Sequence, residues 1–329
     1  MQDRIIKNKK VLVTGGAGFI GSNLCEQLVK QDNDVVCFDN FATGFKHNIQ
    51  DLIGISNFTF IEGDIRNYED CQKAVKGVDV VLHQAALGSV PRSIKDPMTA
   101  TDVNIGGFVK MLFAAKEEGV KRFVYAASSS TYGDHPDLPK LEDKIGNPLS
   151  PYAITKFANE LYAKNFSNIY GIETIGLRYF NVFGRRQDPN GAYAAVIPKF
   201  VKLLIDHKSP VINGDGTHSR DFTYIDNVIQ INQLAAISEN KEAINQVFNV
   251  ACGENNNLNQ MVDYLKEYLS FYDPKIKQVK AIHGPEREGD IKHSLASIQK
   301  AQTLLKYKPT HLFKDGLKES VGWYWKNLQ

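Results

Sequence analysis

Apolar residues in the first half of the chain occur in two alternating patterns, short uninterrupted runs and longer stretches with helical spacing. Short runs predict buried strands, and helical spacing predicts amphipathic helices. We therefore expect strands at 11–14, 34–39, 58–65, 78–83 and 122–127, and helices at 18–31, 97–118 and from about 150 onward. Gly119 stands where a C-cap glycine would end the second of these helices. Such alternation predicts βα units with right-handed crossovers and a parallel sheet, whose ligands bind beyond the carboxyl ends of the strands.

The second half of the chain has longer loops between its apolar segments. Helices are expected near 192–207, 224–237, 258–270 and around 323–325, and a strand at 246–250. The helix at 224–237 and the strand at 246–250 indicate that the chain returns to its first domain before it completes the second. We therefore predict two discontinuous domains, residues 1–180 with 222–250 and residues 181–221 with 251–329.

The segment 11–21 combines an apolar run with glycines at positions 15, 18 and 21, directly before a predicted helix. In a strand–turn–helix context Gly15 permits the tight turn, Gly18 lets backbone amides approach a pyrophosphate, and Gly21 lets the helix pack on the strand. The N-terminus of the helix then points at the phosphates. A glycine-rich loop that binds nothing is the alternative, but the context favours a dinucleotide site. The predicted fold class is α/β, a Rossmann domain built on a doubly wound parallel sheet, with a smaller α/β substrate domain.

Asp39 ends the second predicted strand, about 20 residues beyond the glycine turn. A carboxylate there accepts hydrogen bonds from the 2′- and 3′-hydroxyls of a ribose and repels a 2′-phosphate, so NAD is favoured over NADP. A turn aspartate at a strand end is the other interpretation. Asp64 ends the next predicted strand, where it can meet the adenine amino group. His83 lies in an apolar strand with no second histidine at metal-ligand spacing, so we expect a core histidine and no metal site.

Composition and charge narrow the class of protein. The chain has 329 residues, 43% of them hydrophobic, which is enough for about two domains and a sizeable core. The formal net charge is +2 and no basic block extends beyond residues 7–10, so a nucleic-acid partner is not expected. No apolar run approaches the ~20 residues of a membrane span, and the N-terminus lacks the apolar core of a signal peptide. The four cysteines show no C-x-x-C spacing, which fits reduced thiols in a cytoplasmic protein.

Tyr152 and Lys156 lie four residues apart at the start of a predicted helix. This spacing puts the phenol and the ammonium on one face, where Lys156 can stabilise a phenolate and reach the nicotinamide ribose. A phenol titrates near 10, so a general base at neutral pH needs a pKa lower by about three units. An isolated Y-x-x-x-K pair is usually an ordinary exposed helix pair. Here it follows the glycine motif, Asp39 and a hydroxyl cluster at residues 128–131.

At these positions the chain resembles the extended short-chain dehydrogenase/reductases, nearly end to end. The resemblance rests on G-x-x-G-x-x-G, Asp39, Asp64, Asn104, the hydroxyl cluster and Tyr152 with Lys156. Segments 177–184, 214–222 and 287–290 look like the sugar-nucleotide branch of that superfamily. Segments 87–93, 184–195 and 291–294 resemble its bacterial UDP-N-acetylhexosamine 4-epimerases, which serve surface-polysaccharide synthesis. The resemblance implies bound NAD, a UDP-N-acetylhexosamine substrate, and a homodimer joined through the helices near 97–118 and 152–170.

The resemblance also implies a mechanism. Tyr152, as a phenolate, takes the proton of the sugar 4-hydroxyl while C4 passes a hydride to NAD, and the hydride returns to the opposite face after the 4-keto sugar turns over. Ser128 matches the family's catalytic hydroxyl and hydrogen-bonds the reacting oxygen. Arg220 and Arg287 grip the UDP diphosphate, although by the residues alone each could be a surface cation.

The resemblance assigns the remaining site residues as follows. The expected cofactor-binding residues are Gly15, Gly18, Phe19, Ile20, Gly21, Asp39, Asn40, Gly44, Asp64, Ile65, Gln84, Ala85, Ala86, Asn104, Tyr152, Lys156, Tyr179 and Val182. The expected substrate-binding residues are Gly88, Ser89, Ser128, Ser129, Ser130, Tyr152, Asn181, Gln187, Ala195, Val196, Arg220, Arg287, Asp290 and Ser294. Residues 88–93 are expected to form a turn-rich loop at the border of the cleft. Ser294 is expected to face the C2 substituent of the sugar, unless it only caps a helix starting near 295.

Other functions stay open at this point. A sugar-nucleotide 4,6-dehydratase or UDP-glucuronate decarboxylase shares the first oxidation, but those families carry an acidic residue where this chain has Ser129 and Ser130. An NADP-dependent reductase is opposed by Asp39, and a non-catalytic NAD-binding scaffold is opposed by the intact Tyr152. The sequence leaves open whether C6 of the sugar is a hydroxymethyl or a carboxylate, since Arg92, Arg185 and Arg186 lie in the cleft loops.

Overall fold

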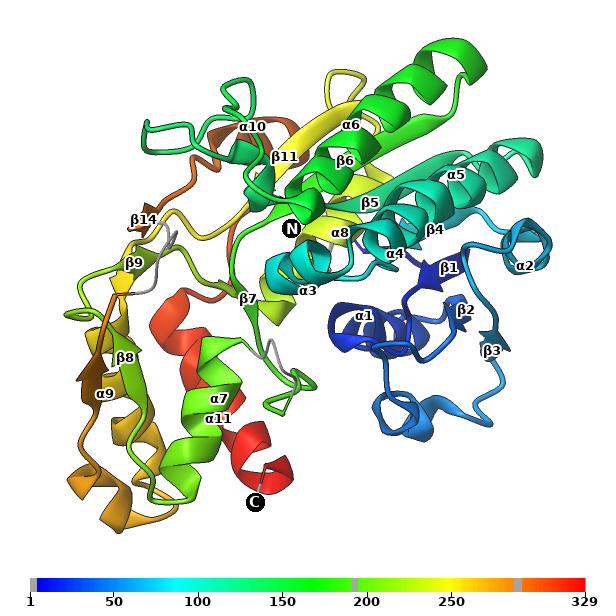
Figure 1. Cartoon of the computed structure of the whole chain (residues 1–329). Helices are drawn as coiled ribbons and strands as arrows, with labels where there is room; N and C mark the ends of the chain where they lie inside the picture. The colour runs from blue at the N-terminus through cyan, green and yellow to red at the C-terminus, as the bar shows by residue number, and fades with distance from the viewer. Residues whose placement is uncertain (1–4, 191–194, 287–291, 329) are drawn as a thin grey trace.

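The computed structural model describes residues 5–190, 195–286 and 292–328. At its centre is a seven-stranded sheet of order β11-β6-β5-β4-β1-β2-β3, in which all neighbours are parallel (Figure 1). Its strands are β1 (Lys10–Thr14), β2 (Asp34–Asp39), β3 (Phe58–Glu62), β4 (Val80–His83), β5 (Arg122–Ser128), β6 (Glu173–Tyr179) and β11 (Gln246–Val250). The strand order reverses between β1 and β4, which is where doubly wound sheets bind ligands. The predicted fold class is confirmed.

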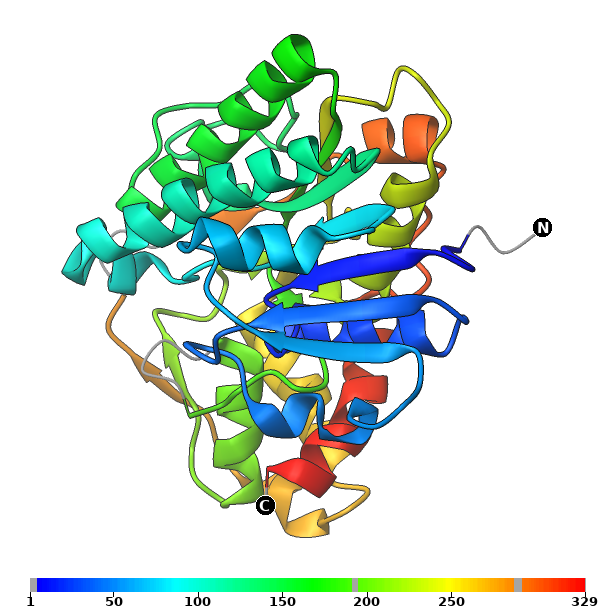
Figure 2. The ribbon, with the colours of Figure 1, turned by 90° about the vertical axis from the view of Figure 1, so that its right-hand side faces the viewer.

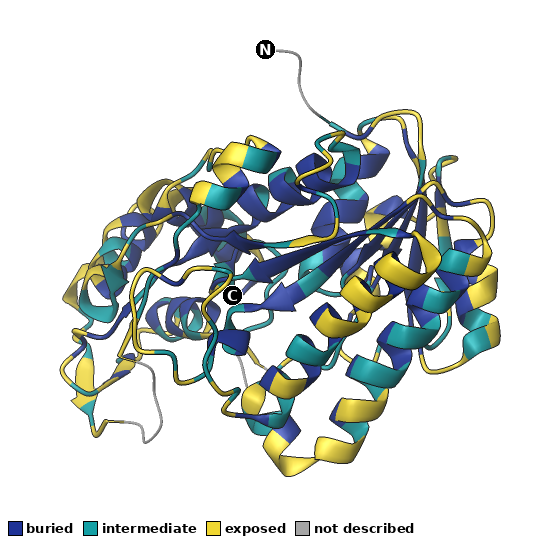
Figure 3. Cartoon of the chain, turned by 90° about the horizontal axis from the view of Figure 1, so that it is seen from above, coloured by how far each residue is buried: buried dark blue, intermediate teal, exposed yellow. Residues whose placement is uncertain are grey.

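Helices cover both faces of this sheet. One face carries α2 (Tyr68–Val75), α5 (Phe108–Glu117) and α6 (Pro151–Tyr170), and the other carries α1 (Phe19–Val29) and α8 (Ile225–Ile237). Because side chains alternate along a strand, Leu12 of β1 packs in the core under α5 and α6, whereas Val11 and Val13 pack in the core under α1 and α8. The strands are therefore buried on both sides, and they are dark blue in Figure 3 while the outer helix faces are yellow.

The segments between the strands differ in part from the prediction. No element was predicted between β2 and β3, and this crossover has no α-helix, only the 3₁₀ turns η1 (Lys46–Asn48) and η2 (Gln50–Leu52). The helix expected at 97–118 is composite, with α4 (Pro97–Thr101), a π-helical turn η3 (Asp102–Gly107) and then α5. The expected loop at 88–93 contains a short helix, α3 (Val90–Lys95), because Ser89 caps it and its proline lies in the first turn, where no backbone N–H is needed.

The smaller part of the molecule is built from α7 (Val196–Ile205), α9 (Leu258–Leu269) and α11 (Phe313–Asn327), which pack on one another at the lower left of Figure 1. In Figure 2 the red α11 lies below the strands of the large sheet. The helix expected at 192–207 starts at Val196 and ends at Ile205, and residues 192–194 lie outside the described residues. The core is continuous between the two parts, since Phe183 and Phe313 belong to the same cluster as Val11.

The smaller part also contains short strands that pair with one another. β7 (Val182–Phe183) pairs with β10 (Thr223–Tyr224), and β8 (Val211–Asn213) pairs with β13 (Ile282–Gly284). β9 (Ser219–Arg220) lies between β12 (Asn256–Asn257) and β14 (His293–Ser294). The remaining elements are η4 (Ser129–Tyr132), η5 (Pro274–Gln278) and α10 (Gln299–Leu305). α8 and β11 return the chain to the large sheet, α9 and α11 belong to the smaller part, and α10 between them in the sequence packs on β11 and α8 of the large sheet.

The four cysteines are buried free thiols, as expected from their positions. None of the helices among the described residues combines the length and the apolar character that crossing a membrane requires.

Candidate functional site

A cavity of about 430 Å³ lies at the switch point between β1 and β4. Its wall is made by the ends of β1 to β4, the first turn of α1, and residues of α3 and α4. Twelve of the expected cofactor residues line it, namely Gly15, Gly18, Phe19, Ile20, Gly21, Asp39, Asn40, Asp64, Ile65, Gln84, Ala85 and Ala86, and so does Gly88 from the substrate set. The structure therefore brings together residues that are up to 73 positions apart, from Gly15 to Gly88.

The glycine turn has the shape that a dinucleotide needs. Gly15 has a φ of +65°, and a Cβ on it would lie 2.7 Å from the backbone nitrogen of Ala85. A Cβ on Gly21 would overlap the carbonyl oxygen of Gly15, so α1 packs directly on the turn. α1 begins after Gly18 without a side-chain cap, which leaves the amides of its first turn for a ligand in the cavity. These features fit a pyrophosphate.

Asp39 is buried at the end of β2, inside the cavity wall. Its carboxylate accepts hydrogen bonds from the backbone N–H of Ala17 at 2.9 Å and of Phe41 at 2.8 Å. Burial raises the pKa of Asp39, while these backbone bonds act in the opposite direction. The carboxylate is thus oriented by the two loops on either side of it, and each oxygen keeps a second lone pair for a ribose hydroxyl.

Asp64 lies two residues beyond β3, which ends at Glu62, so the strand expected at 58–65 is shorter than predicted. Its carboxylate accepts a hydrogen bond from Arg66 at 2.7 Å and one from Asn40 at 2.9 Å. The Arg66 guanidinium holds the pKa of Asp64 below its usual range. Arg66 itself lines the cavity and was missed by the sequence analysis. It follows the carboxyl end of β3, and that position is the signal that could have identified it.

Six expected cofactor residues do not line this cavity, namely Tyr152 and Lys156, which are described below, and Gly44, Asn104, Tyr179 and Val182. Gly44 packs against Ala17 in the glycine turn. Asn104 is buried in the π-helical turn and bonds both the N–H and the carbonyl of Leu87, at 2.7 and 3.2 Å. The Tyr179 hydroxyl donates to Gln84 at 3.1 Å and accepts from Asn232 at 2.9 Å. Asn104 and Tyr179 therefore fix the segment that follows β4.

Tyr152 and Lys156 lie on the first turns of α6, next to the carboxyl end of β5. Ser150 caps α6, and the backbone N–H of Tyr152 donates to Ser93 of α3 at 3.0 Å. The Lys156 ammonium donates to the carbonyl of Ala126 at 2.8 Å and lies 6.0 Å from the centre of the Tyr152 ring. Burial lowers the pKa of Lys156 to about 8, so the side chain still carries its proton at neutral pH.

Ser128 is the last residue of β5 and faces the phenol. Burial raises the pKa of Tyr152, and a hydrogen bond with Ser128 acts in the opposite direction. Ser128 also accepts hydrogen bonds from the backbone and hydroxyl of Ser130, at 3.2 and 2.9 Å. Ser129 and Ser130 form the η4 turn directly after it. The described residues thus place the phenol, the ammonium and the hydroxyl cluster together, as predicted.

His83 is a core histidine, as expected. It is buried between Phe108 and Phe123, and its Nδ1 lies 2.9 Å from the Thr14 hydroxyl. Burial lowers its pKa to about 3, so the ring is neutral at physiological pH. Nowhere in the described parts of the chain do His, Cys, Asp and Glu side chains group as a metal site.

Three expected substrate residues meet at short strands beyond the sheet. Asn181, in the left-handed region with a φ of +38°, donates to the carbonyl of Asp221 at 3.0 Å. Arg220 lies in β9, where its register partner in β14 is Ser294. Ser294 is therefore in a strand, and the idea that it caps a helix near 295 is wrong, because α10 begins at Gln299. Arg287 and Asp290 lie outside the described residues.

The remaining substrate residues belong to loops and helix starts. Ala195 and Val196 form the N-terminus of α7, which has no side-chain cap. Gln187 donates to the carbonyl of Val182 at 3.0 Å, and its buried Oε1 has no hydrogen-bond partner among the residues that the structure describes. Ser89 has a φ of +113°, an uncommon conformation for a residue with a side chain, at the cleft border.

Two of the three arginines considered for a C6 carboxylate face other parts of the molecule. Arg185 pairs with Asp226 of α8 at 2.7 Å, and Arg186 pairs with Glu26 of α1 at 2.6 Å. Arg92 of α3 lines the cavity. Ser93, which orients the start of α6, lies one residue further, and no role was predicted for it.

Residues 11–251 match the family described as NAD dependent epimerase/dehydratase. A solved UDP-N-acetylglucosamine 4-epimerase from Methanobrevibacter ruminantium, in complex with UDP-N-acetylmuramic acid, is 39% identical, covers 98% of this chain and 99% of its own, and has a TM-score of 0.91. A UDP-glucuronic acid 4-epimerase from Bacillus cereus, solved with UDP-glucuronic acid and NAD, is 34% identical over 96% of this chain and 99% of its own, with a TM-score of 0.85. A putative UDP-glucose 4-epimerase from Methanocaldococcus jannaschii is 36% identical over 96% of this chain and 99% of its own length.

Proposed function

Because the chain belongs to the NAD-dependent epimerase/dehydratase family, we propose that it is a UDP-sugar 4-epimerase. Its preferred substrates are UDP-N-acetylglucosamine and UDP-N-acetylgalactosamine, or the uronic acids of these two. The observation that carries the proposal is the meeting of Ser128, Tyr152 and Lys156 beside the cavity at the switch point. A non-catalytic scaffold has no need of this arrangement. The product serves the synthesis of a surface polysaccharide.

The residues of the chain divide the chemistry between them. Tyr152 moves the proton of the sugar 4-hydroxyl, and Ser128 hydrogen-bonds the same oxygen. Lys156 stays protonated at neutral pH, and we expect its positive charge to favour the phenolate against the burial that raises the pKa of Tyr152. Bound NAD supplies the reversible oxidation at C4. Gly15, Gly18 and Asp39, with the other residues of the cavity wall, hold that cofactor.

A 4-epimerase must hold the nucleotide firmly and the hexose lightly, so that the 4-keto sugar can rotate in the site and present its other face. Asn181 and Arg220 stand at neighbouring strand ends, and Ala195 and Val196 start α7 without a side-chain cap. A helix N-terminus and an arginine are both suited to a diphosphate. We assign Arg287 and Asp290 to the same UDP on the resemblance alone.

Ser294 supports the N-acetylated substrates. It lies in β14 beside Arg220, the residue proposed to bind the diphosphate, and no helix starts within its reach as a cap. A serine there leaves space for an acetamido group and offers it a hydroxyl. Among the arginines in the cleft loops, Arg92 lines the cavity, so it is the side chain to test with the uronic acid substrates.

A 4,6-dehydratase or UDP-glucuronate decarboxylase is less well supported. Both reactions need a further proton transfer, and the positions that carry an acid in those families are Ser129 and Ser130 in η4. Neither hydroxyl is a carboxylate with a suitable pKa.

We further propose a homodimer and the two discontinuous domains given above. Five apolar side chains, each more than half exposed, lie on α3, α4 and α6: Ile94, Met98, Ile154, Leu161 and Ile169. The return of β11 to the edge of the large sheet supports the domain boundaries.

The decisive experiment uses four substrates: UDP-glucose, UDP-N-acetylglucosamine and their two uronic acids. Purified protein is first examined by mass and absorbance for bound NAD, and each sugar is then followed by NMR or chromatography. We expect bound NAD and fastest turnover of an N-acetylated sugar. Bound NAD without turnover of any of the four would support the scaffold, and a 4-keto-6-deoxy or pentose product would support the dehydratase or the decarboxylase.

A further inference from the structure

Tyr152, Lys156 and Glu160 follow one another at four-residue spacing on α6, so they share one stripe of the helix. Glu160 is buried, one turn beyond Lys156. Its two carboxylate oxygens accept hydrogen bonds from Arg178 of β6, from Nε at 2.9 Å and from Nη2 at 2.7 Å. The charged pair is therefore a two-point connection between the proposed catalytic helix and the sheet.

Arg178 also reaches the turn that carries the hydroxyl cluster. Its guanidinium lies 4.8 Å from the centre of the Tyr132 ring, and Tyr132 ends the η4 turn that starts directly after Ser128. The Tyr132 hydroxyl donates to Asn249 of β11 at 2.6 Å, so the far end of this ring is fixed as well. One arginine thus contacts both elements that must be in register for catalysis, the helix of Tyr152 and the turn after Ser128.

We infer that the Arg178–Glu160 pair positions Tyr152 of α6 against Ser128 of β5 during epimerisation. The inference rests on the proposed function. A buried ion pair is weak evidence for stability, because the cost of removing both charges from water offsets much of their attraction. A two-point contact placed between the two proposed catalytic elements is instead suited to fixing their geometry, since small misplacements of reacting groups are costly in rate.

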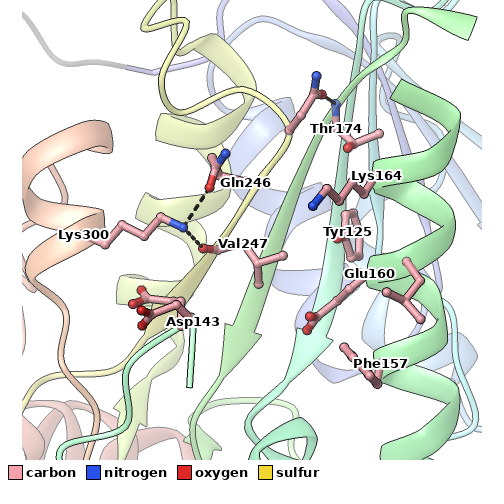
Figure 4. Close-up of a pocket in the computed structure, with 12 residues that line it drawn as sticks. Tyr125, Asp143, Phe157, Glu160, Lys164, Thr174, Gln246, Val247 and Lys300 are labelled. Carbon is pink, nitrogen blue, oxygen red and sulfur yellow. Dashed lines mark hydrogen bonds between the residues drawn. The ribbon is translucent and has the colours of Figure 1, made fainter. Parts of the chain in front are cut away.

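The surroundings of the pair define the charges that matter for a test. Glu160 lines a hollow of about 270 Å³ between α6 and α10, where Figure 4 shows it with Lys164 on one side and Asp143 and Lys300 on the other. The titratable and charged groups around the pair are Tyr125, Tyr132, Glu142, Asp143, Lys164 and Lys300. Near Tyr152 the charged or titratable groups are Lys156 and, behind it, His83, and the helix α3, which packs on α6, carries Arg92 and Lys95.

The first test measures how the opposite charges of Glu160 and Arg178 shift the pH dependence of kcat. Glu160 is eight residues from Tyr152, which is about 12 Å along the helix, and a unit charge at that distance shifts a pKa by about 0.5 to 1 unit for an effective dielectric constant of roughly 20 to 40. Glu160→Gln leaves a positive charge and should lower the pH at which kcat is half-maximal on its acid side. Arg178→Gln leaves a negative charge and should raise it. The double variant should return the midpoint to that of the wild type.

Geometry is tested separately from charge. We expect kcat at the optimum pH to fall about 10- to 100-fold in both single variants and the double variant, while KM changes less than about threefold. Arg178→Lys keeps the positive charge but cannot make both hydrogen bonds to Glu160. The midpoint of its pH profile should therefore match that of the wild type while kcat stays low. The pair of Arg122 with Glu173, at 2.7 Å, provides the control. It joins the first residues of β5 and β6, so it lies at the end of the sheet away from Ser128, about 20 Å from it. Arg122→Gln should lower stability and change neither kcat nor the midpoint.

The outcomes separate this inference from the proposed function. If the wild type turns over none of the UDP-sugars, the proposed function fails. The pKa of the Tyr152 phenol is then measured directly by absorbance near 295 nm. Each variant is compared with the same variant that also carries Tyr152→Phe, so that the signal of the other tyrosines is subtracted. Opposite shifts of the phenol in Glu160→Gln and Arg178→Gln then still support the inference. Shifts in the same direction, or variants that only lose thermal stability as Arg122→Gln does, would overturn it.

Discussion

Replacing Lys156 with methionine should stabilise the protein at neutral pH while it removes activity. Lys156 is buried, and its pKa falls from 10.5 in the unfolded chain to about 8 in the folded protein. Each pKa unit is about 1.4 kcal/mol, so keeping this ammonium charged in the fold costs about 3 kcal/mol at pH 7. Methionine fills a similar volume, but the carbonyl of Ala126 loses its donor at a cost of about 1 kcal/mol. The net expected gain is about 2 kcal/mol.

The pH dependence identifies the cause. Below pH 8 both the folded and the unfolded protein carry the Lys156 proton, and the penalty is complete. Between about 8 and 10.5 the unfolded chain binds more protons at this site than the folded one, so the wild type gains stability as the pH rises. The advantage of Lys156→Met should therefore be greatest at pH 7 and should be lost before pH 10.5, where only the cost of about 1 kcal/mol at the Ala126 carbonyl remains.

The assay is urea unfolding of NAD-free protein between pH 7 and 10.5, since bound cofactor would itself add stability. Lys164→Met is the matched control, because Lys164 is exposed on the same helix and its replacement should change the free energy of unfolding by less than about 0.5 kcal/mol at every pH. A Lys156→Met protein that is less stable than the wild type at pH 7, or whose difference is the same at both ends of the range, would refute the reasoning. The expected result would show that Lys156 serves function at the expense of the stability of the fold.

Three further predictions concern the cofactor and the sugar. Tyr152→Phe should keep NAD bound, by mass, and lower turnover about 10²- to 10⁴-fold; activity within tenfold of the wild type would contradict its role as acid and base. Asp39→Ala should weaken NAD and reduce discrimination against NADP by about 1–3 kcal/mol in binding titrations, whereas an unchanged preference would contradict the ribose assignment. Ser294→Tyr should lower kcat/KM for UDP-N-acetylglucosamine ~5- to 150-fold and spare UDP-glucose, and an equal fall for both sugars would show that Ser294 is not a gate.

The parts of the fold that local sequence determines were predictable. The glycine turn, the strand ending at Asp39 and the α6 start at Ser150 each depend on residues within one βα unit, so spacing alone was sufficient. The pairing of Tyr152 with Lys156 is likewise a property of one helix. These are also the elements that place the candidate cofactor cavity.

Contacts between distant segments were not predictable in the same way. The bond from Tyr152 to Ser93 joins residues 59 positions apart, and nothing in either local motif indicates it. The helix α3 was missed because proline and glycine in 88–93 suggested a turn, although proline is compatible with a first helical turn. Ser294 was open between a pocket residue and a helix cap, and its strand was not predicted, because two-residue strands such as β14 have no periodicity to detect.

The edge strand β11 has a consequence for how the protein is made. The chain leaves the large sheet after Tyr179 and comes back at Gln246, where β11 pairs with β6 along its whole length. Until the ribosome has released residue 250, the backbone of β6 has an open edge that another chain could pair with. Fragments that stop at the end of the first continuous segment, near residue 180, should therefore aggregate in the cell. A first segment made alone would keep this open edge, and in the full chain the edge is covered only after α7 and α8, when β11 has been made.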